Sequence, residues 1–156
     1  MRAFQHLFPL ANTYLARRIE QADLRLPYID YFKQAIDNRD IAGDRFFVHL
    51  EDVETPDILV LVADFFLRVN TVTWSIVSGV YEDRIVIIFR NDGLRRDAGK
   101  VAARAFVRFG TAGGHKSMAR AEFLLNEIAT QVDINRPDKL GSWIKERVDR
   151  LLVKTT

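Results

Sequence analysis

The run Ile85-Val86-Ile87-Ile88-Phe89 restricts the possible folds most strongly, because five consecutive apolar residues fit a β-strand that is covered on both faces. Such a strand belongs near the centre of a sheet. Residues 71–80 are also strand-like, and the segment Tyr81-Glu82-Asp83 between the two runs predicts an antiparallel hairpin. Further strands are predicted at 45–53 and 121–128.

Helical periodicity of apolar residues separates these strands. It predicts helices over 9–21, 27–38, 55–69, 97–109 and 137–153, with a break at 38–44. On the 55–69 helix, Asp64 and Arg68 are four residues apart and predict a surface ion pair. The whole pattern predicts an α/β fold with a mixed central sheet of about four to five strands, flanked by helices and preceded by N-terminal connecting helices.

Composition excludes several classes of site. The chain has 156 residues, 48% of them hydrophobic and 28% charged, which is typical of one globular domain. Its formal charge of +2 gives no overall field that would indicate nucleic-acid binding, so any basic site must be local. Without cysteine there are no disulfides and no thiolate ligands, and we expect a cytoplasmic protein. No apolar run reaches the ~20 residues of a membrane helix.

The histidines indicate no metal site. His6, His49 and His115 are far apart in the sequence, and none has a carboxylate at metal-ligand spacing. For His49, in the middle of a predicted strand, the expected environment is a satisfied core position or solvent.

The segment Gly110-Thr111-Ala112-Gly113-Gly114 is the least ordinary in composition. Three glycines cost backbone entropy, so they indicate positive φ angles or a ligand that lies against bare backbone. We expect a loop whose N–H groups, with a short helix from Ser117, hold phosphate or carboxylate oxygens. A plain helix-to-strand turn is the alternative interpretation.

Cationic and polar side chains surround this segment in the sequence. His115 and Lys116 follow it directly, and Arg90 and Asn91 emerge where the apolar strand ends. The preceding helix carries Lys100, Arg104 and Arg108 at i, i+4 spacing, which puts three cations in one stripe. A solvated helix face and a strand-terminal arginine in water are the alternatives for these positions.

Together, the strand ending Ile88-Phe89-Arg90-Asn91 and the run Phe109-Gly110-Thr111-Ala112-Gly113-Gly114-His115 resemble the C-terminal DHH-associated domain of the DHH (Asp-His-His) phosphoesterases. The resemblance extends over about 22–125. That family includes single-strand exonucleases, oligoribonucleases that also act on bisphosphorylated nucleosides, cyclic dinucleotide phosphodiesterases and exopolyphosphatases. By resemblance, Arg90, Gly113, Gly114 and His115 would hold the phosphate or terminal nucleotide of a substrate, with Asn91 and Lys116 beside them. Many members have a third glycine where this chain has Ala112.

In that family an N-terminal domain carries the Asp-His-His motif and the aspartates that bind two manganese ions. This sequence contains no such motif. The resemblance therefore implies a 45–156 substrate-binding domain, a 1–44 helical linker region leading from an absent catalytic domain, and a chain that is inactive alone. The implied partners are that catalytic domain and a short nucleic acid or phosphorylated nucleotide. Two alternatives remain open: a stand-alone module that binds single-stranded nucleic acid without hydrolysis, and a structural or dimerising domain.

Overall fold

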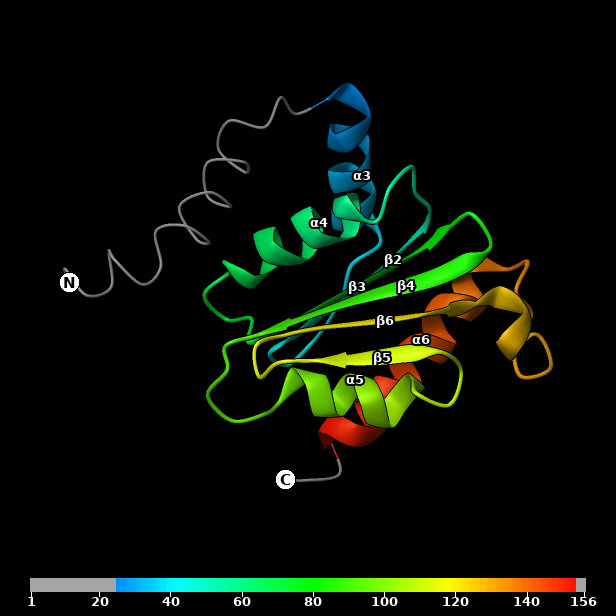
Figure 1. Cartoon of the computed structure of the whole chain (residues 1–156). Coiled ribbons are helices and arrows are strands. Elements are labelled where there is room, and N and C mark those ends of the chain that lie inside the picture. The colour runs from blue at the N-terminus through cyan, green and yellow to red at the C-terminus, as the bar shows by residue number, and fades with distance from the viewer. Residues whose placement is uncertain (1–24, 154–156) are drawn as a thin grey trace, which may run out of the picture. The chain divides into compact units, whose positions relative to one another are not determined.

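The computed structural model describes residues 25–153 (Figure 1). The chain divides between Asp30 and Tyr31 into two units, and the sheet and its covering helices belong to the second. The predicted helix at 9–21 lies outside the described residues, and the predicted domain boundary at residues 44 and 45 stays a prediction. In chain order the elements are α3 (Leu26–Asp37), β1 (Asp40–Ala42), β2 (Arg45–Asp52), α4 (Asp57–Leu67), β3 (Trp74–Tyr81), β4 (Arg84–Asn91), α5 (Ala98–Phe106), β5 (Thr111–Gly114), β6 (Met118–Leu124), the 3₁₀ helix η2 (Leu125–Ile128) and α6 (Pro137–Val153).

The strands form one mixed sheet in the order β1-β2-β3-β4-β6-β5. Only the β2–β3 pair is parallel, and β3 and β4 form the predicted antiparallel hairpin. The predicted mixed α/β fold is confirmed, although the sheet has six strands rather than four or five. Both additional strands are short edge strands: β1 lies inside the predicted break, and β5 lies inside the predicted glycine loop.

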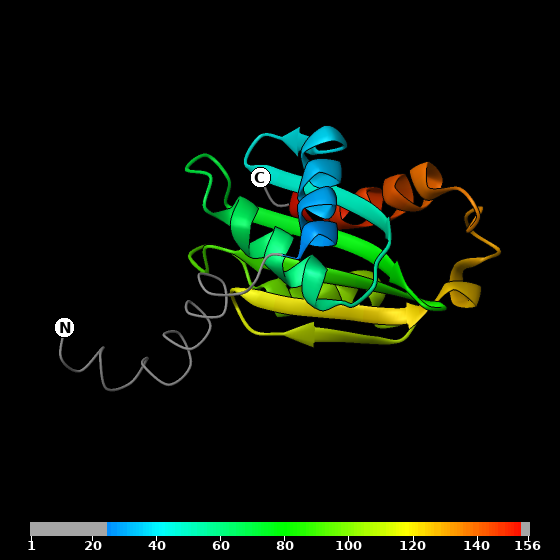
Figure 2. The ribbon, with the colours of Figure 1, turned by 90° about the horizontal axis from the view of Figure 1, so that it is seen from above.

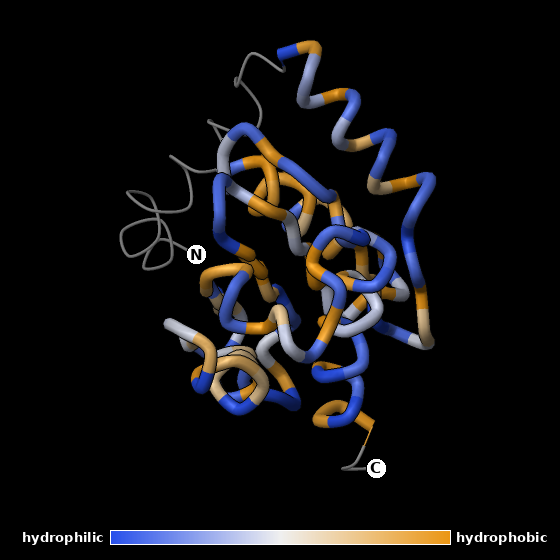
Figure 3. Tube along the Cα trace, turned by 90° about the vertical axis from the view of Figure 1, so that its right-hand side faces the viewer, coloured by the Kyte–Doolittle hydropathy of each residue, from blue (hydrophilic) through white to orange (hydrophobic). Residues whose placement is uncertain are grey.

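Helices cover the sheet unequally. Helix α4 packs over β2, β3 and β4 on one face, whereas α5 and α6 lie on the other face, with α5 over β4, β5 and β6 and α6 against β2 and α5 (Figures 1 and 2). Hydrophobic and hydrophilic residues alternate along the helical turns, as expected for helices with one buried side (Figure 3). We call the two faces of the sheet the α4 face and the α5–α6 face.

Strand β4 is the buried strand that the sequence predicts. Residues 85–89 are each at most 1% exposed, because β4 lies between β3 and β6 and has helices over both of its faces. Ile85, Ile87 and Phe89 join the core under α5 and α6, where Phe106 and Phe123 stack with their ring centroids 5.6 Å apart. The α4 face has its own core, with Phe46 of β2 stacked on Phe66 of α4 at 4.1 Å.

The segment after β5 is extended rather than helical, so the predicted short helix from Ser117 is wrong. Strand β6 begins at Met118, and the predicted strand at 121–128 continues from it only to Leu124 before η2. The reason is visible in the burial pattern: Ala119, Ala121 and Phe123 are buried, while the residues between them are exposed or half-buried. An alternation with period two is the pattern of a strand covered on one face.

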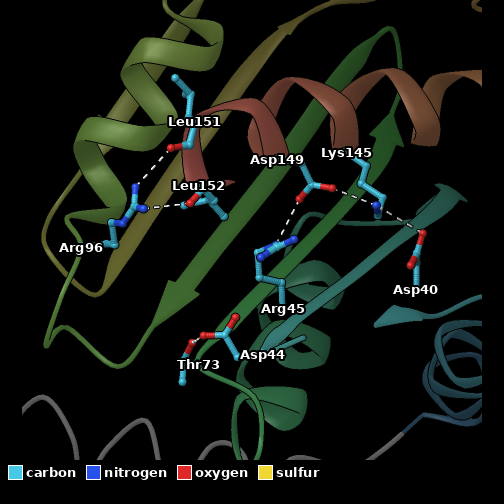
Figure 4. Close-up of polar contacts among 9 residues, drawn as sticks. All are labelled: Asp40, Asp44, Arg45, Thr73, Arg96, Lys145, Asp149, Leu151 and Leu152. Atoms are coloured by element: carbon cyan, nitrogen blue, oxygen red, sulfur yellow. Dashed lines mark hydrogen bonds and ion pairs between the residues drawn. The ribbon is translucent and has the colours of Figure 1, made fainter. Parts of the chain in front are cut away.

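Ion pairs attach α6 to the first two strands (Figure 4). Lys145 Nζ lies 2.8 Å from Asp149 Oδ2 on α6 itself and 3.7 Å from Asp40 Oδ2 of β1. Asp149 Oδ1 in turn accepts a hydrogen bond from Arg45 Nε of β2 at 3.2 Å. The pairs raise the pKa of Lys145 above its ordinary value, mainly through the hydrogen bond to Asp149. None of the helices between residues 25 and 153 is long and apolar enough to cross a membrane.

Candidate functional site

Arg90 is held inside the α4 face. Its Nε donates to Asp64 Oδ1 of α4 at 2.8 Å, its Nη1 donates to the Phe89 carbonyl at 3.1 Å, and its side chain is only 11% exposed. The predicted pair between Asp64 and Arg68 is therefore wrong. A guanidinium this deeply buried needs a counter-charge, and Asp64 supplies it from the helix that covers the strand.

Asn91 has both polar atoms of its amide engaged locally. Its Nδ2 donates to the Arg96 carbonyl at 3.1 Å, and its Oδ1 accepts from the Gly93 N–H at 2.8 Å. The residue is 3% exposed. Asn91 thus shapes the loop between β4 and α5.

The glycine-rich segment is an edge strand and not the predicted loop, so its N–H groups lie along a strand instead of converging in a nest. Two of its glycines are explained by the fold. Gly114 has φ of +154°, and a Cβ there would lie 2.3 Å from the Met118 carbonyl oxygen. At Gly110 a Cβ would lie 2.5 Å from the Glu122 carbonyl oxygen. Both positions exclude a side chain.

Gly113 has no such explanation. A Cβ at Gly113 would meet no atom within 4 Å, and the residue has no positive φ angle. It is paired with Arg120 on β6, and Arg120 is paired with Ile88 on β4. The fold would therefore accept alanine here, and the space beside the bare backbone is free.

The sheet brings the backbones of His115 and Arg90 to the same strand residue. The His115 N–H donates to the Met118 carbonyl at 2.7 Å, and Met118 is the register partner of Arg90. The row that contains Gly113 and Arg120 is the second one along the strands, beyond the row of Gly114 and Ala119. Residues two apart along a strand project to the same face, so Arg90 and Ile88 share the α4 face with Met118 and Arg120.

Part of the α4 face carries no helix from residues 25–153. Strands β6 and β5 extend beyond α4 (Figure 2), and on them Met118 is 43% exposed and Arg120 is exposed. Arg120 Nη2 lies 3.0 Å from Glu122 Oε2 on the same strand. We call the surface formed by Thr111, Gly113, Met118, Arg120 and Glu122 the open face. It combines one apolar side chain, Met118, with a charged pair, Arg120 and Glu122, next to Arg90.

Sequence reasoning missed Asp64 as the partner of Arg90, and it missed Met118 and Arg120. Asp64 could not be found from the sequence, since no local spacing connects it to residue 90. The other two left a signal: residues 118–124 alternate between small or aromatic residues and charged or long ones. That alternation is typical of a strand with one open face.

The predicted basic stripe lies on the other side of the sheet. Lys100, Arg104 and Arg108 are exposed, but α5 belongs to the α5–α6 face, and it ends at Phe106, before Arg108. The stripe is therefore separated from the side chain of Arg90 by the sheet. The N-terminal end of α5 is closer to the predicted site, because the Gly99 N–H donates to the His115 carbonyl at 2.8 Å. The Ala98 N–H donates likewise to the carbonyl of Lys116, whose side chain is exposed.

A cavity of about 520 Å³ lies at the end of the sheet where β2 and β3 begin, and none of the predicted site residues lines it. Several of its polar groups are engaged in hydrogen bonds. Arg96 donates to the carbonyls of Leu151 at 3.2 Å and Leu152 at 2.8 Å, which caps the last turn of α6 (Figure 4). Asp44 accepts a hydrogen bond from Thr73. This cavity is a structural feature of the α6 attachment.

His49 lines a smaller cavity of about 280 Å³ beside the start of α6. Its Nδ1 lies 2.8 Å from Ser78 Oγ, and its Nε2 is buried without a hydrogen-bond partner in the described structure. Burial lowers the pKa of His49 from 6.5 to about 4. Of the two expected environments, a satisfied core position or solvent, the structure shows a buried core position in which one of the two ring nitrogens is hydrogen-bonded. Between residues 25 and 153, no group of three or more histidine, aspartate or glutamate side chains could hold a metal ion.

Comparison with known proteins gives one similar sequence and several similar structures. No family model matches the chain. An uncharacterized protein of Methanocaldococcus jannaschii is 27% identical over 108 residues, which are 69% of this chain and 22% of that protein. The chain therefore spans about a fifth of the length of this relative.

Three solved structures share the fold. An exopolyphosphatase-related protein of Bacteroides fragilis aligns with a TM-score of 0.53 at 14% identity, over 81% of this chain and 36% of that one. The DHH domain of a member of a ribosomal protein family aligns at 0.51 and 13%, over 92% of this chain and 35% of that one. The C-Ala domain of Aquifex aeolicus alanyl-tRNA synthetase aligns at 0.50 and 16%, over 72% of this chain and 96% of that domain. The chain has the fold of these domains. The predicted resemblance to DHH-family proteins is confirmed at that level.

Proposed function

We propose that this chain is the substrate-binding, DHH-associated domain of a metal-dependent phosphoesterase, and that its open face holds a phosphate or terminal nucleotide of the substrate. The observation that carries this proposal is Gly113. It is a glycine that the fold does not require, next to free space, two rows along the sheet from the one that joins His115 and Arg90 and on the same face of the sheet. Bare backbone next to a cation and an imidazole suits a phosphate that must approach the main chain closely.

Each residue would have a defined part in this arrangement. Asp64 fixes the guanidinium of Arg90 through Nε, and the hydrogen bond to Phe89 uses Nη1, which leaves Nη2 as the donor for an anion. His115 and Lys116 are exposed and would add a titratable donor and a fixed positive charge. Met118 offers an apolar surface for a base or ribose. Asn91 would act through the loop that it shapes.

The chemistry of cleavage would come from elsewhere. Two manganese ions, held by an N-terminal Asp-His-His domain, would polarise the phosphate and generate the attacking hydroxide. The domain described here would contribute positioning and neutralisation of charge. Oligonucleotides, nucleoside bisphosphates, cyclic dinucleotides and polyphosphate are the candidate substrates, and a cytoplasmic location would fit all of them.

Calorimetric titration of the full chain tests the proposal. The ligands are a 5′-phosphorylated dinucleotide, a nucleoside 3′,5′-bisphosphate, a cyclic dinucleotide and a short polyphosphate. At least one should bind, and His115→Ala should weaken it about tenfold or more, because one charge-assisted hydrogen bond contributes about 1.5–3 kcal/mol. Lys139→Ala, an exposed cation at the start of α6, is the control and should leave the affinity unchanged. Binding by none of the four ligands, or equal affinity in both variants, would contradict the proposal.

The stand-alone nucleic-acid-binding module remains the second candidate. The fold shared with the C-Ala domain of the synthetase agrees with this second function. This chain aligns with 96% of that domain, and it contains no Asp-His-His motif. The same titrations, with a long single-stranded oligonucleotide added as a fifth ligand, separate the two functions. A binding module should bind long single strands and ignore the mononucleotides, whereas a substrate-binding domain should bind short phosphorylated ligands.

A further inference from the structure

The basic residues of the described part of the chain divide into those in ion pairs and those without one, and several of the second kind gather on α5, the residues after it and α6. Each basic residue of one large set lies in an ion pair with an aspartate or glutamate: Lys33, Arg45, Arg84, Arg90, Arg120, Arg136 and Lys145. Within residues 25–153, no carboxylate lies at ion-pair distance from any of five others, Lys100, Arg104, Arg108, Arg147 and Arg150. We call these five residues the basic track.

Aromatic rings hold two members of the basic track together. The guanidinium carbon of Arg147, on α6, lies 4.9 Å from the ring centroid of Phe109 and 5.0 Å from that of Trp143. The guanidinium of Arg108, from the end of the α5 segment, lies 5.3 Å from the same Phe109 ring. Arg147 Nε also donates to the Ala105 carbonyl at 3.1 Å. The two charges are thus fixed in place by the fold and not left on free side chains.

The remaining members extend this cluster into a line. Lys100 and Arg104 are four residues apart on α5, which is about 6 Å of helix rise, and Arg108 follows four residues later, after the helix has ended at Phe106. Burial lowers the pKa of Arg147, and the nearby positive charges of Arg108 and Arg150 lower this pKa further. Arg150 therefore belongs to the same cluster of charges. Like charges gathered without an acid repel each other, so an anionic partner would relieve the repulsion.

The composition of the surface indicates the kind of anion. A protein interface has an apolar core with few charges, but the exposed large hydrophobic residues of 98–109 and 137–153 are only Val107 and Val153. A line of guanidinium groups fits a chain of phosphates, because the planar fork donates two hydrogen bonds to one phosphate. The guanidinium groups lie over the rings of Phe109 and Trp143, so these ring faces are not available to stack with nucleic-acid bases.

We propose that the basic track binds the phosphate backbone of a nucleic-acid strand without reading its sequence. The track lies across the sheet from the Arg90 side chain and does not depend on the proposed phosphate site there. It would hold a strand longer than the dinucleotide or mononucleotide that the open face is proposed to bind.

Fluorescence anisotropy with a labelled 20-nucleotide oligo-dT tests this proposal on the full chain. If all five cations contact phosphates, the plot of log binding constant against log salt should have a slope of about −3.5, at roughly −0.7 per contact for a single strand. The double variant Arg104→Glu, Arg150→Glu should weaken binding more than tenfold at about 0.1 M salt and reduce the slope by about 1.4.

The matched control is Arg68→Glu, Lys139→Glu, which changes the net charge equally at two exposed cations outside the track. It should weaken binding less than threefold, and thermal melts should show that both double variants fold. Polyphosphate should displace the oligonucleotide at equal charge concentration, whereas polyglutamate should not. Equal losses in the two double variants, or equal displacement by polyglutamate, would overturn the proposal.

Discussion

Gly113→Ala separates folding from ligand binding at the open face. In the free protein the new methyl group enters space in which no atom lies within 4 Å, and the backbone φ does not require glycine. Replacing such a glycine reduces the conformational freedom of the unfolded chain, so the free energy of unfolding should rise by about 0.4–1 kcal/mol or stay the same. Urea denaturation measures this directly.

The same methyl group should impair ligand binding. A phosphate that approaches the backbone at Gly113 would lose a charge-assisted hydrogen bond, which contributes about 1.5–3 kcal/mol. The affinity for the phosphorylated ligand should therefore fall by roughly 10-fold to 150-fold. Calorimetry on the same preparation gives this value, and the opposite signs of the two effects are the diagnostic result.

Gly114→Ala is the structural counterpart. Its Cβ would lie 2.3 Å from a carbonyl oxygen and the residue has φ of +154°, so this variant should lose about 2 kcal/mol or more of unfolding free energy. If Gly113→Ala bound the ligand as tightly as the parent chain, the close approach of phosphate to this backbone would be refuted. If it were destabilised as much as Gly114→Ala, the geometry of β5 would be wrong.

Three further predictions follow from particular contacts. Asp64→Asn should lower the unfolding free energy by about 2 kcal/mol, less than for a fully buried pair because Asp64 is 34% exposed, whereas Arg68→Ala should change it by less than about 0.5 kcal/mol in urea melts. Because the pKa of His49 is lowered from 6.5 to about 4, the unfolded chain binds its proton first, and stability should fall by at most roughly 3 kcal/mol as pH decreases through that interval. His49→Gln should flatten this part of the curve, and an unchanged slope would contradict the assigned environment. The purified chain should hydrolyse neither a dinucleotide nor polyphosphate with manganese present, and turnover that His115→Ala abolishes would show that catalysis needs no second domain.

Elements with strong periodicity could be predicted from the sequence. The run at 85–89 identified the buried central strand, and the apolar stripe of 137–153 gave α6 with its observed bounds. The edge strands could not be recognised. β1 has three residues, and β5 is a four-residue run with two glycines, whose extended state depends on hydrogen bonds to β6 and on contact with α5. A glycine-rich sequence indicates that the backbone can adopt many conformations, but it does not indicate which one pairing with a neighbouring strand selects.

At the candidate site, residue types were easier to predict than their partners. The sequence singled out Arg90, but the counter-charge from Asp64 depends on how α4 crosses β4, which no local spacing encodes. For the same reason, the stripe at 100–108, which the sequence predicts to support the glycine segment, lies across the sheet from the Arg90 side chain in the structure. The spacing of residues in the sequence predicts which of them share one side of a helix. Which face of the sheet that helix covers depends on how the helix packs.

The distribution of counter-charges separates the two candidate surfaces more clearly than any motif does. On the α4 face, Asp64 neutralises Arg90 and Glu122 pairs with Arg120, so a ligand there meets donors already oriented by acids and must compete for them. Affinity at that face should therefore depend on close backbone approach and vary little with salt. Within residues 25–153, no carboxylate lies at ion-pair distance from the basic track, so its binding should be dominated by counterion release and vary steeply with salt. Measuring the salt slope for a short phosphorylated ligand and for oligo-dT on one preparation therefore assigns each ligand to its face, and identical slopes would show that a single surface binds both.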